Sequence, residues 1–243
     1  MNVLITGSSG FTGKYLTKYL LEKGCSVFTL NRKKISGIRN YSLEKNFSSE
    51  KISKIIQKVK PNYIFHLAGC AVDQNIENYY RINTLFGSYL LSAIEKQKLD
   101  SFTKIMFFGT AAEYGLVNKN LLPLEESYLC NPFSHYGISK LGQTRMALEW
   151  GKLNNKRKIC VVRPFNLLGD GMRAHLSIGS FYKQIKEFND QKNRLFLQVG
   201  NLNVRRDFIS INDAVKIFWL LINNENSFNK VINVCSGKSI SLK

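Results

Sequence analysis

The chain has 243 residues, 44% of them hydrophobic, enough for one sizeable domain with a small appended lobe. No apolar run approaches the roughly 18 to 20 residues that span a bilayer. The chain has 35 Lys and Arg residues against 17 Asp and Glu, which gives a net charge of +18 that attracts phosphates. The basic clusters at 32–34 and 154–158 contain no aromatic residues, so they do not indicate a dedicated nucleic-acid-binding surface.

Short apolar runs alternate with amphipathic segments over the first two-thirds of the chain. The runs predict buried strands at residues 2–5, 26–30, 63–67, 104–108 and 159–162. The segments between them have near-helical apolar spacing and predict helices at 11–23, 50–59, 75–96 and 136–154. This order predicts an α/β fold, a Rossmann-type doubly wound parallel sheet with helices on both faces.

After residue 164 the pattern is less regular. It predicts helices at 180–189 and 212–223 and strands at 195–199 and 231–234. We expect a dinucleotide-binding domain at 1–165, followed by a small substrate-binding lobe at 166–243 that returns to the sheet near 205–235.

The first predicted strand leads into a glycine-rich loop, TGSSGFTG at 6–13, and a predicted helix follows at once. Gly7, Gly10 and Gly13 permit a tight turn, close backbone approach to a pyrophosphate and tight packing of helix on strand. The helix N-terminus adds free N–H groups and partial positive charge. The loop therefore predicts dinucleotide binding, with an ordinary strand–helix turn as the alternative.

The end of the second predicted strand indicates which dinucleotide. An acidic residue there would bind the adenosine ribose hydroxyls and repel a 2′-phosphate. The chain instead has Asn31, Arg32, Lys33 and Lys34. We predict that Asn31 and Arg32 lie in the cofactor site and expect NADP(H) rather than NAD(H), with an exposed basic turn as the alternative.

A hydroxyl, a tyrosine and a lysine are candidates for one active site. Tyr136 and Lys140 are four residues apart on a predicted helix and share a face. A nearby ammonium lowers the pKa of a phenol, whose ordinary value near 10 makes it a poor acid or base at neutral pH. A Ser or Thr hydroxyl at the end of a neighbouring strand, such as Thr110, would hold the substrate oxygen beside the phenol. A surface pair on a helix is the alternative.

The motifs together resemble the extended short-chain dehydrogenase/reductase family, also described as the NAD-dependent epimerase/dehydratase family, in its sugar-nucleotide-modifying branch. The matching segments run in the family's order over nearly the whole chain: TGSSGFTG (6–13), HLAG (66–69), NTLFG (83–87), GTAAEYG (109–115), YGISK (136–140), RPFNLLGDG (163–171) and RRDFISINDA (205–214).

The resemblance implies roles for individual residues. It implies that Thr110, Tyr136 and Lys140 are catalytic, and that Asn83 supports the lysine region. It further implies that the pyrophosphate is held by Gly7, Gly10, Phe11 and Gly13. The cofactor would be lined by Leu67, Ala68 and Gly69, beside Tyr136 and Lys140. The diphosphate of the sugar nucleotide would be contacted by Asn166 and Arg206. His175, in the loop after the diphosphate segment, is a further candidate for contact with sugar or base.

Ala111 and Ala112 bear on the reaction. In the family's 4,6-dehydratases, Asp and Glu follow the catalytic Thr and eliminate water, and alanines cannot transfer protons. In its 3,5-epimerase/4-reductases a cysteine of this segment transfers protons, yet the chain has no cysteine between Cys70 and Cys130. The site is therefore predicted to move a hydride and a hydroxyl proton, without dehydration or inversion beside the ketone.

The expected activity is NADPH-dependent reduction of the C4 ketone of a nucleoside-diphosphate 4-keto-6-deoxy sugar, with GDP favoured as the nucleotide and CDP as an alternative. The basic turn at 31–34 favours this activity over a sugar-nucleotide 4-epimerase, which commonly retains NAD. An NADP-binding or RNA-binding basic module is the non-enzymatic alternative.

The remaining expectations concern partners and location. The five cysteines stand singly, which favours reduced thiols in a cytoplasmic protein and no metal site. We expect a homodimer that binds a nucleotide sugar but neither membrane nor nucleic acid. The sequence ends at CSGKSISLK, where the resemblance implies further substrate lobe, so the lobe is expected to be short.

Overall fold

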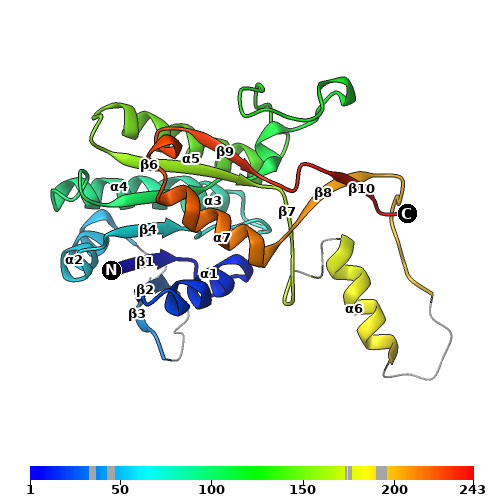
Figure 1. Ribbon diagram of the computed structural model, residues 1–243, viewed down its shortest axis with the longest axis horizontal. Helices are drawn as coiled ribbons and strands as arrows, with labels where there is room; N and C mark the ends of the chain where they lie inside the picture. The colour runs from blue at the N-terminus through cyan, green and yellow to red at the C-terminus, as the bar shows by residue number, and fades with distance from the viewer. Residues whose placement is uncertain (33–36, 43–46, 173, 175–176, 190–195) are drawn as a thin grey trace.

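A seven-stranded parallel sheet forms the centre of the protein (Figure 1). The structure is a computed structural model that describes residues 1–32, 37–42, 47–172, 174, 177–189 and 196–243, without the side chains of Lys119 and Asn189. The strand order is β3-β2-β1-β4-β5-β6-β9. The strands are β1 (Asn2–Thr6), β2 (Ser26–Asn31), β3 (Arg39–Ser42), β4 (Tyr63–His66), β5 (Lys104–Phe108), β6 (Lys158–Pro164) and β9 (Val231–Val234). The predicted doubly wound fold is confirmed.

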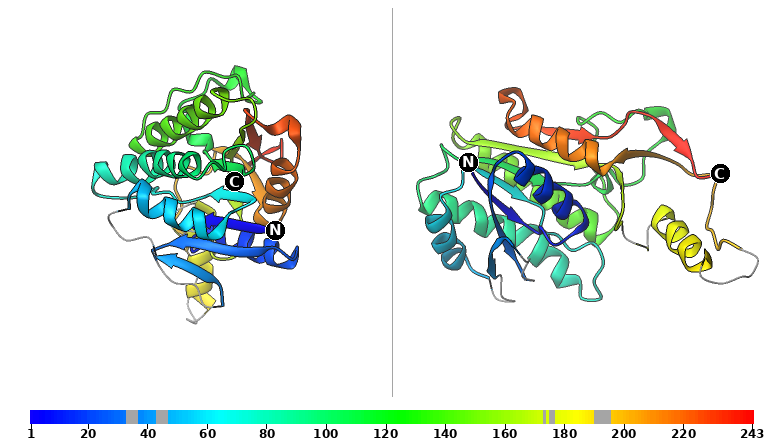
Figure 2. Two further views of the ribbon diagram at one scale, coloured as in Figure 1. Left: turned by 90° about the vertical axis from the view of Figure 1, so that its left-hand side faces the viewer. Right: turned by 60° about the horizontal axis from the view of Figure 1, so that its bottom comes forward.

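Helices cover both faces of this sheet (Figures 1 and 2). One core cluster contains α1 (Phe11–Glu22) and α7 (Ile211–Ile222), and the other contains α2 (Ser49–Val59), α4 (Phe86–Lys96) and α5 (His135–Lys152). Successive residues of a strand alternate between the two clusters: Val3 and Ile5 pack toward α1 and α7, whereas Leu4 packs toward the opposite helices. Burial on both faces explains why these strands read as continuous apolar runs.

The helix predicted at 75–96 is interrupted. It consists of α3 (Ile76–Tyr80), a π-helical segment η1 (Arg81–Leu85) and then α4. Short 3₁₀ turns, η2 (Ala111–Tyr114), η3 (Lys119–Leu121) and η4 (Glu225–Ser227), occur elsewhere.

A second, three-stranded sheet lies beside the carboxyl end of the large sheet, with α6 (Ser177–Asn189) projecting next to it (Figure 1). In it, β8 (Arg205–Ser210) pairs with β7 (Asn166–Leu168) in parallel and with β10 (Ser239–Ser241) antiparallel. The chain passes from β6 into β7 at residue 165 and returns through α7 and β9 to the large sheet. The functional division at residue 165 stays a prediction.

The strand predicted at 195–199 is wrong for residues 196–199, which form no strand. The physical reason is a side chain of α6: Gln184 Oε1 accepts the Gln198 N–H at 2.7 Å, and Gln184 Nε2 donates to the Gln198 carbonyl at 3.1 Å. These bonds satisfy the Gln198 N–H and carbonyl groups, which would otherwise be free to pair with a neighbouring strand.

Within the described part of the chain, the helices are all too short or too polar to cross a membrane. All five cysteines, Cys25, Cys70, Cys130, Cys160 and Cys235, are free thiols.

Phe218 fixes α7 to the sheet. Its side chain is fully buried, and its ring meets Phe108 of β5 edge-on with centroids 4.8 Å apart. Phe218→Ala is expected to lower the free energy of unfolding by about 3–5 kcal/mol, because it removes a large buried ring and leaves a cavity. Urea unfolding followed by circular dichroism measures this loss.

Leu220→Ala is the matched control, because Leu220 lies on the same helix and is 67% exposed. Its effect is expected to stay within about 0.5 kcal/mol. Equal losses in the two variants would contradict the packing described for α7.

Candidate active site

The glycine-rich loop is held by backbone contacts that exclude side chains. Gly7 has φ +73°, and a Cβ on it would lie 2.6 Å from the Ala68 nitrogen. A Cβ on Gly13 would lie 2.4 Å from the Gly7 carbonyl oxygen. The loop after β1 is therefore pressed against the end of β4 and against the first turn of α1, so predicted cofactor residues from both loops meet.

This loop fits a dinucleotide pyrophosphate. A Cβ on Gly10 would meet only the Gly7 carbonyl oxygen, at 3.3 Å, so its outer side is open among the described residues. The first turn of α1 has neither a capping side chain nor an acidic residue, which leaves its N–H groups to an anion. Phe11 starts this helix and packs edge-on against Tyr15 at 5.6 Å between ring centroids.

The end of β2 combines a buried amide with an exposed cation. Asn31 is buried, and its Nδ2 donates to Ser8 Oγ in the glycine-rich loop and to Asn40 Oδ1. Its Oδ1 has no hydrogen-bond partner among the described residues. Arg32 is exposed at the same edge. Asn31 thus braces the loop, and Lys33 and Lys34 lie outside the described residues.

The end of β4 is tied to β1 by Thr6. Thr6 Oγ1 accepts the Ala68 N–H at 3.1 Å and lies 2.9 Å from His66 Nδ1, and the Leu67 N–H donates to the Thr6 carbonyl at 3.1 Å. Gly69 follows in an exposed position. Leu67, Ala68 and Gly69 therefore continue directly from the switch point between β1 and β4, where open α/β sheets bind ligands.

Burial sets the charge state of His66. Burial, followed by the charge of Lys140, lowers the pKa of His66 to about 3. His66 is therefore a neutral side chain of the core at neutral pH, packed between the rings of Phe86 and Phe107.

Thr110 lies where β5 ends and the turn η2 begins. Its Oγ1 accepts the Ala112 N–H at 3.3 Å, which leaves the hydroxyl hydrogen for donation to another oxygen. A Cβ on Gly137 would lie 2.8 Å from the Ala112 carbonyl oxygen, so the first turn of α5 packs directly on η2. The contact brings the Thr110 segment against the helix that begins with His135 and Tyr136.

Lys140 is buried on α5, one turn after the half-buried Tyr136. Its ammonium donates to Gln143 Oε1 at 2.5 Å. Burial lowers the pKa of Lys140 to about 8, and the nearby carboxylate of Glu113 opposes that shift.

Asn83 links the Lys140 region to the β4 loop. Its Oδ1 accepts the Cys70 N–H at 2.7 Å, and its Nδ2 donates to the Cys70 carbonyl and to Ser139 Oγ, both at 2.9 Å. Thr84 Oγ1 donates to the Ser139 carbonyl at 2.9 Å. These bonds connect the π-helical segment η1 to the residue before Lys140, and the support role of Asn83 stays a prediction.

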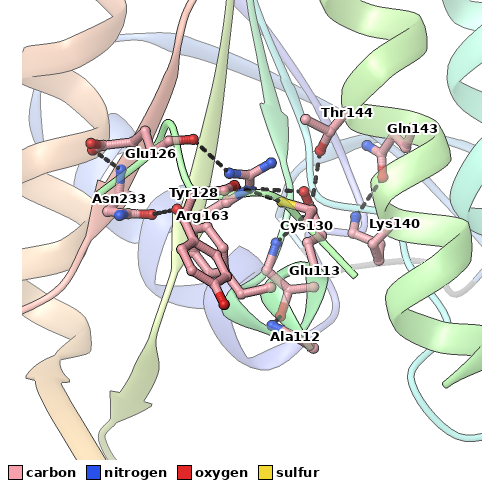
Figure 3. A network of polar contacts seen from close by, with 12 residues as sticks. Ala112, Glu113, Glu126, Tyr128, Cys130, Lys140, Gln143, Thr144, Arg163 and Asn233 are labelled. Carbon is pink, nitrogen blue, oxygen red and sulfur yellow. Dashed lines mark hydrogen bonds and ion pairs between the residues drawn. The ribbon is translucent and has the colours of Figure 1, made fainter. Parts of the chain in front are cut away.

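Glu113 and Arg163 form a buried ion pair (Figure 3), and the Thr110 N–H donates to the Glu113 carboxylate at 3.0 Å. Arg163 Nε donates to Glu113 Oε2 at 2.9 Å, and the guanidinium carbon lies 4.7 Å from the centroid of the Tyr114 ring. This pair was not predicted from the sequence. The signal was present in VVRPF, because an arginine within a buried strand requires an opposite charge or several acceptors.

An open cavity of about 500 Å³ lies beside the small sheet and α6, and Asn166 and Arg206 are among the residues that line it. Arg205 is instead held by β10, since its Nη2 donates to the Ser239 carbonyl at 2.6 Å. The Asn166 amide donates to the Asp207 carbonyl at 2.7 Å. His175 lies outside the described residues. The apolar part of the lining includes Leu167, Met172, Ile178, Phe181, Leu202 and Phe208.

Comparisons with known proteins agree with this architecture. The model of the "NAD dependent epimerase/dehydratase family" matches residues 3–235. The chain is 32% identical to a GDP-6-deoxy-D-talose 4-dehydrogenase of Aggregatibacter actinomycetemcomitans, over 100% of this chain and 76% of that protein. It is 28% identical to a GDP-6-deoxy-D-mannose reductase of Pseudomonas aeruginosa, over 99% and 76%. The fold matches RMD from Pseudomonas aeruginosa complexed with NADPH, with a TM-score of 0.82 and 24% identity over 100% of this chain and 78% of that one.

Gly13→Ala tests the loop. The added methyl group would lie 2.4 Å from the Gly7 carbonyl oxygen, so the loop must move. Overpacking of this kind costs about 1–3 kcal/mol, so we expect dinucleotide affinity, measured by calorimetry with NADPH and with NADH, to fall by about 10- to 100-fold. Gly142→Ala is the control, because its methyl group would meet only Thr84, at 3.6 Å. Unchanged affinity in Gly13→Ala would contradict the role of this loop.

His66 predicts a pH dependence of stability. Its folded pKa of about 3 lies below the ordinary 6.5, so its contribution is complete above pH 6.5 and is lost as the pH falls toward 3. Between pH 7 and pH 5 the wild type is expected to lose about 2 kcal/mol of unfolding free energy through this residue. Urea titrations of wild type and His66→Asn at both pH values measure it, and equal losses in the two proteins would show that His66 does not titrate as described.

Proposed function

The chain belongs to the NAD dependent epimerase/dehydratase family, and we propose that it uses NADPH to reduce the C4 ketone of a nucleoside-diphosphate 4-keto-6-deoxy sugar. As a member of this family it is an NAD(P)-dependent oxidoreductase. GDP is the favoured nucleotide, with CDP as the alternative.

One observation carries the proposal: the turn beside Thr110 presents no group that transfers protons. Ala111 and Ala112 have no titratable side chain, and Glu113, the next residue, is fully buried and paired with Arg163. Elimination of water and inversion next to a ketone both need an acid or a base, and the family resemblance places these groups in this segment. Reduction of a ketone needs only a hydride and one proton.

The residues of this chain have simple parts in the proposed reduction. NADPH supplies the hydride when it is bound. Tyr136 donates the proton to the developing alkoxide, and the Thr110 hydroxyl donates a hydrogen bond to the same oxygen. Lys140 carries the positive charge that lowers the pKa of the Tyr136 phenol and binds the nicotinamide ribose. General acid catalysis of this kind contributes about 10²–10⁴-fold.

The cofactor preference rests on the end of β2. Asn31 is buried against the glycine-rich loop and carries no charge, while Arg32 is exposed beside it. An exposed guanidinium without a carboxylate suits a 2′-phosphate, which Arg binds well. The NADPH complex of the Pseudomonas aeruginosa protein supports the same choice, and NAD(H) is the alternative.

The proposed substrate site is the cavity that Asn166 and Arg206 line. Its volume of about 500 Å³ lies within the roughly 300–1,000 Å³ usual for small-molecule sites, and it combines apolar walls with few polar groups. The exposed Arg206 guanidinium is suited to a diphosphate. Both reported relatives are named for GDP-6-deoxy sugars. We propose further that the protein acts as a homodimer on a nucleotide sugar and does not bind nucleic acid.

The test is to mix the protein with NADPH and GDP-4-keto-6-deoxymannose and follow the absorbance of reduced nicotinamide. We expect consumption in the wild type and a loss of about 10²–10⁴-fold in Tyr136→Phe, with NADPH binding retained, because only the proton donor is removed. Tyr19→Phe on α1 is the control.

Two other outcomes overturn the proposal. Interconversion of two nucleotide sugars at C4 without net cofactor consumption would identify a 4-epimerase. Absence of dinucleotide binding, together with RNA binding that weakens steeply with salt, would identify a basic binding module.

A further inference from the structure

The Glu113 carboxylate accepts hydrogen bonds from three different elements (Figure 3). Its Oε1 accepts the Thr110 N–H and the Thr144 hydroxyl, both at 3.0 Å. Its Oε2 accepts the Arg163 Nε–H at 2.9 Å. Glu113 is fully buried, and each of its partners other than Thr110 is at most 4% exposed. The carboxylate is therefore enclosed and satisfied, and cannot act as an acid or base toward a substrate.

The partners place this carboxylate between the two halves of the proposed site. Thr110 begins the turn after β5, whereas Thr144 lies on α5, one turn after Lys140. Arg163 belongs to β6, the neighbour of β5 in the sheet. The same oxygen that holds the Thr110 backbone thus also holds the helix that carries Tyr136 and Lys140.

The Glu113 carboxylate occupies the space that a side chain at position 109 would need. A Cβ on Gly109 would lie 2.4 Å from Glu113 Oε1 and 3.2 Å from Thr144 Oγ1. The position before Thr110 therefore has to lack a side chain for the carboxylate to reach both partners.

We infer that Glu113 is a positioning residue, which fixes the Thr110 hydroxyl relative to the α5 helix that carries Tyr136 and Lys140. The inference rests on the proposed function of those three residues. Distances between reacting groups matter steeply in catalysis, since a misplacement of about 1 Å can cost about 10²-fold. A charged acceptor with three strong donors restricts such movement better than a neutral contact does.

Glu113 also contributes charge at Lys140. Burial lowers the pKa of Lys140 to about 8, and Glu113 acts in the opposite direction. His66 on β4 also interacts with this ammonium, and Tyr136 lies one turn away on α5. Since His66 is neutral above pH 6.5, removal of the Glu113 charge is expected to shift the Lys140 titration to lower pH.

The first experiment separates geometry from charge. Thr144→Val removes the hydroxyl and keeps the side-chain shape, while the Glu113–Arg163 pair and the Glu113–Thr110 bond remain. We expect kcat to fall about tenfold with KM unchanged, because the weakened link between Thr110 and α5 lets the reacting groups shift, and a misplacement of about 1 Å can cost about 10²-fold. Amide exchange at Thr110, measured by NMR without substrate, is expected to rise by a similar factor.

The chain offers matched controls. Thr144→Ser keeps the hydroxyl and is expected to restore most of kcat relative to Thr144→Val. Thr17→Val makes the same change at another buried threonine, whose Oγ1 has no hydrogen-bond partner in the described part of the chain, and is expected to leave kcat and Thr110 exchange unchanged.

The second experiment tests the charge. Glu113→Gln keeps the shape and removes the negative charge, and the Lys140 Cε resonance in lysine-labelled protein, assigned with Lys140→Met, reports the ammonium titration. We expect its midpoint to move below the wild-type value of about 8, and to stay in place in Thr144→Val. If Glu113→Gln unfolds, the comparison of Thr144→Val with Thr17→Val still tests the positioning role, because Thr144→Val leaves the Glu113–Arg163 pair in place.

The outcomes distinguish this inference from the proposed function. Wild-type protein that reduces no keto sugar overturns the function, while Thr110 exchange and Lys140 titration still test the position and charge of Glu113. Thr144→Val that matches Thr17→Val in kcat and exchange, or a Lys140 midpoint that does not move when the Glu113 charge is lost, overturns the positioning role.

Discussion

The contact between the loop after β1 and the end of β4 is the constraint on which the candidate site depends. A side chain at Gly7 would overlap the Ala68 backbone, so the two loops can approach only because residue 7 is a glycine. The approach aims the open first turn of α1 at the space between β1 and β4. Because β4 pairs with β5, the same edge of the sheet also carries Thr110. Residues more than 100 positions apart in the sequence therefore lie along one edge of the sheet.

The large sheet was largely predictable from the sequence because its strands are buried on both faces and its helices on one. β3 was not, since Arg39–Ser42 is a polar edge strand without an apolar run. β7 and β10 have three residues each and are specified by pairing with β8 rather than by local pattern. The π-helical segment η1 follows apolar spacing like an ordinary helix, and it differs through tertiary bonds of Asn83 and Thr84 that no local pattern reveals.

The residues of the candidate site also differ in how well the sequence predicts them. Gly7, Gly10, Gly13 and the Tyr136–Lys140 spacing are local signals, which a sequence displays directly. The Glu113–Arg163 pair joins residues 50 positions apart and exists only because β5 and β6 are neighbours. Asn31 was correctly located at the end of β2, but its side chain is turned inward to Ser8, a choice that depends on the fold of the loop.

The geometry of η2 explains why Glu113 cannot replace carboxylates at the two preceding positions. A 3₁₀ turn has three residues per turn, so position 113 lies on the same side as position 110, and 111 and 112 lie on the other sides. Burial follows this pattern, because Ala112 is exposed and Ala111 partly exposed while Glu113 is enclosed. A buried ion pair is weak evidence for stability, since well-packed apolar residues of similar volume are often at least as stabilising. Its contact with Thr110 is better explained by orientation. A carboxylate at position 113 instead of 111 or 112 cannot transfer protons to a substrate, and it holds Thr110 in place relative to α5.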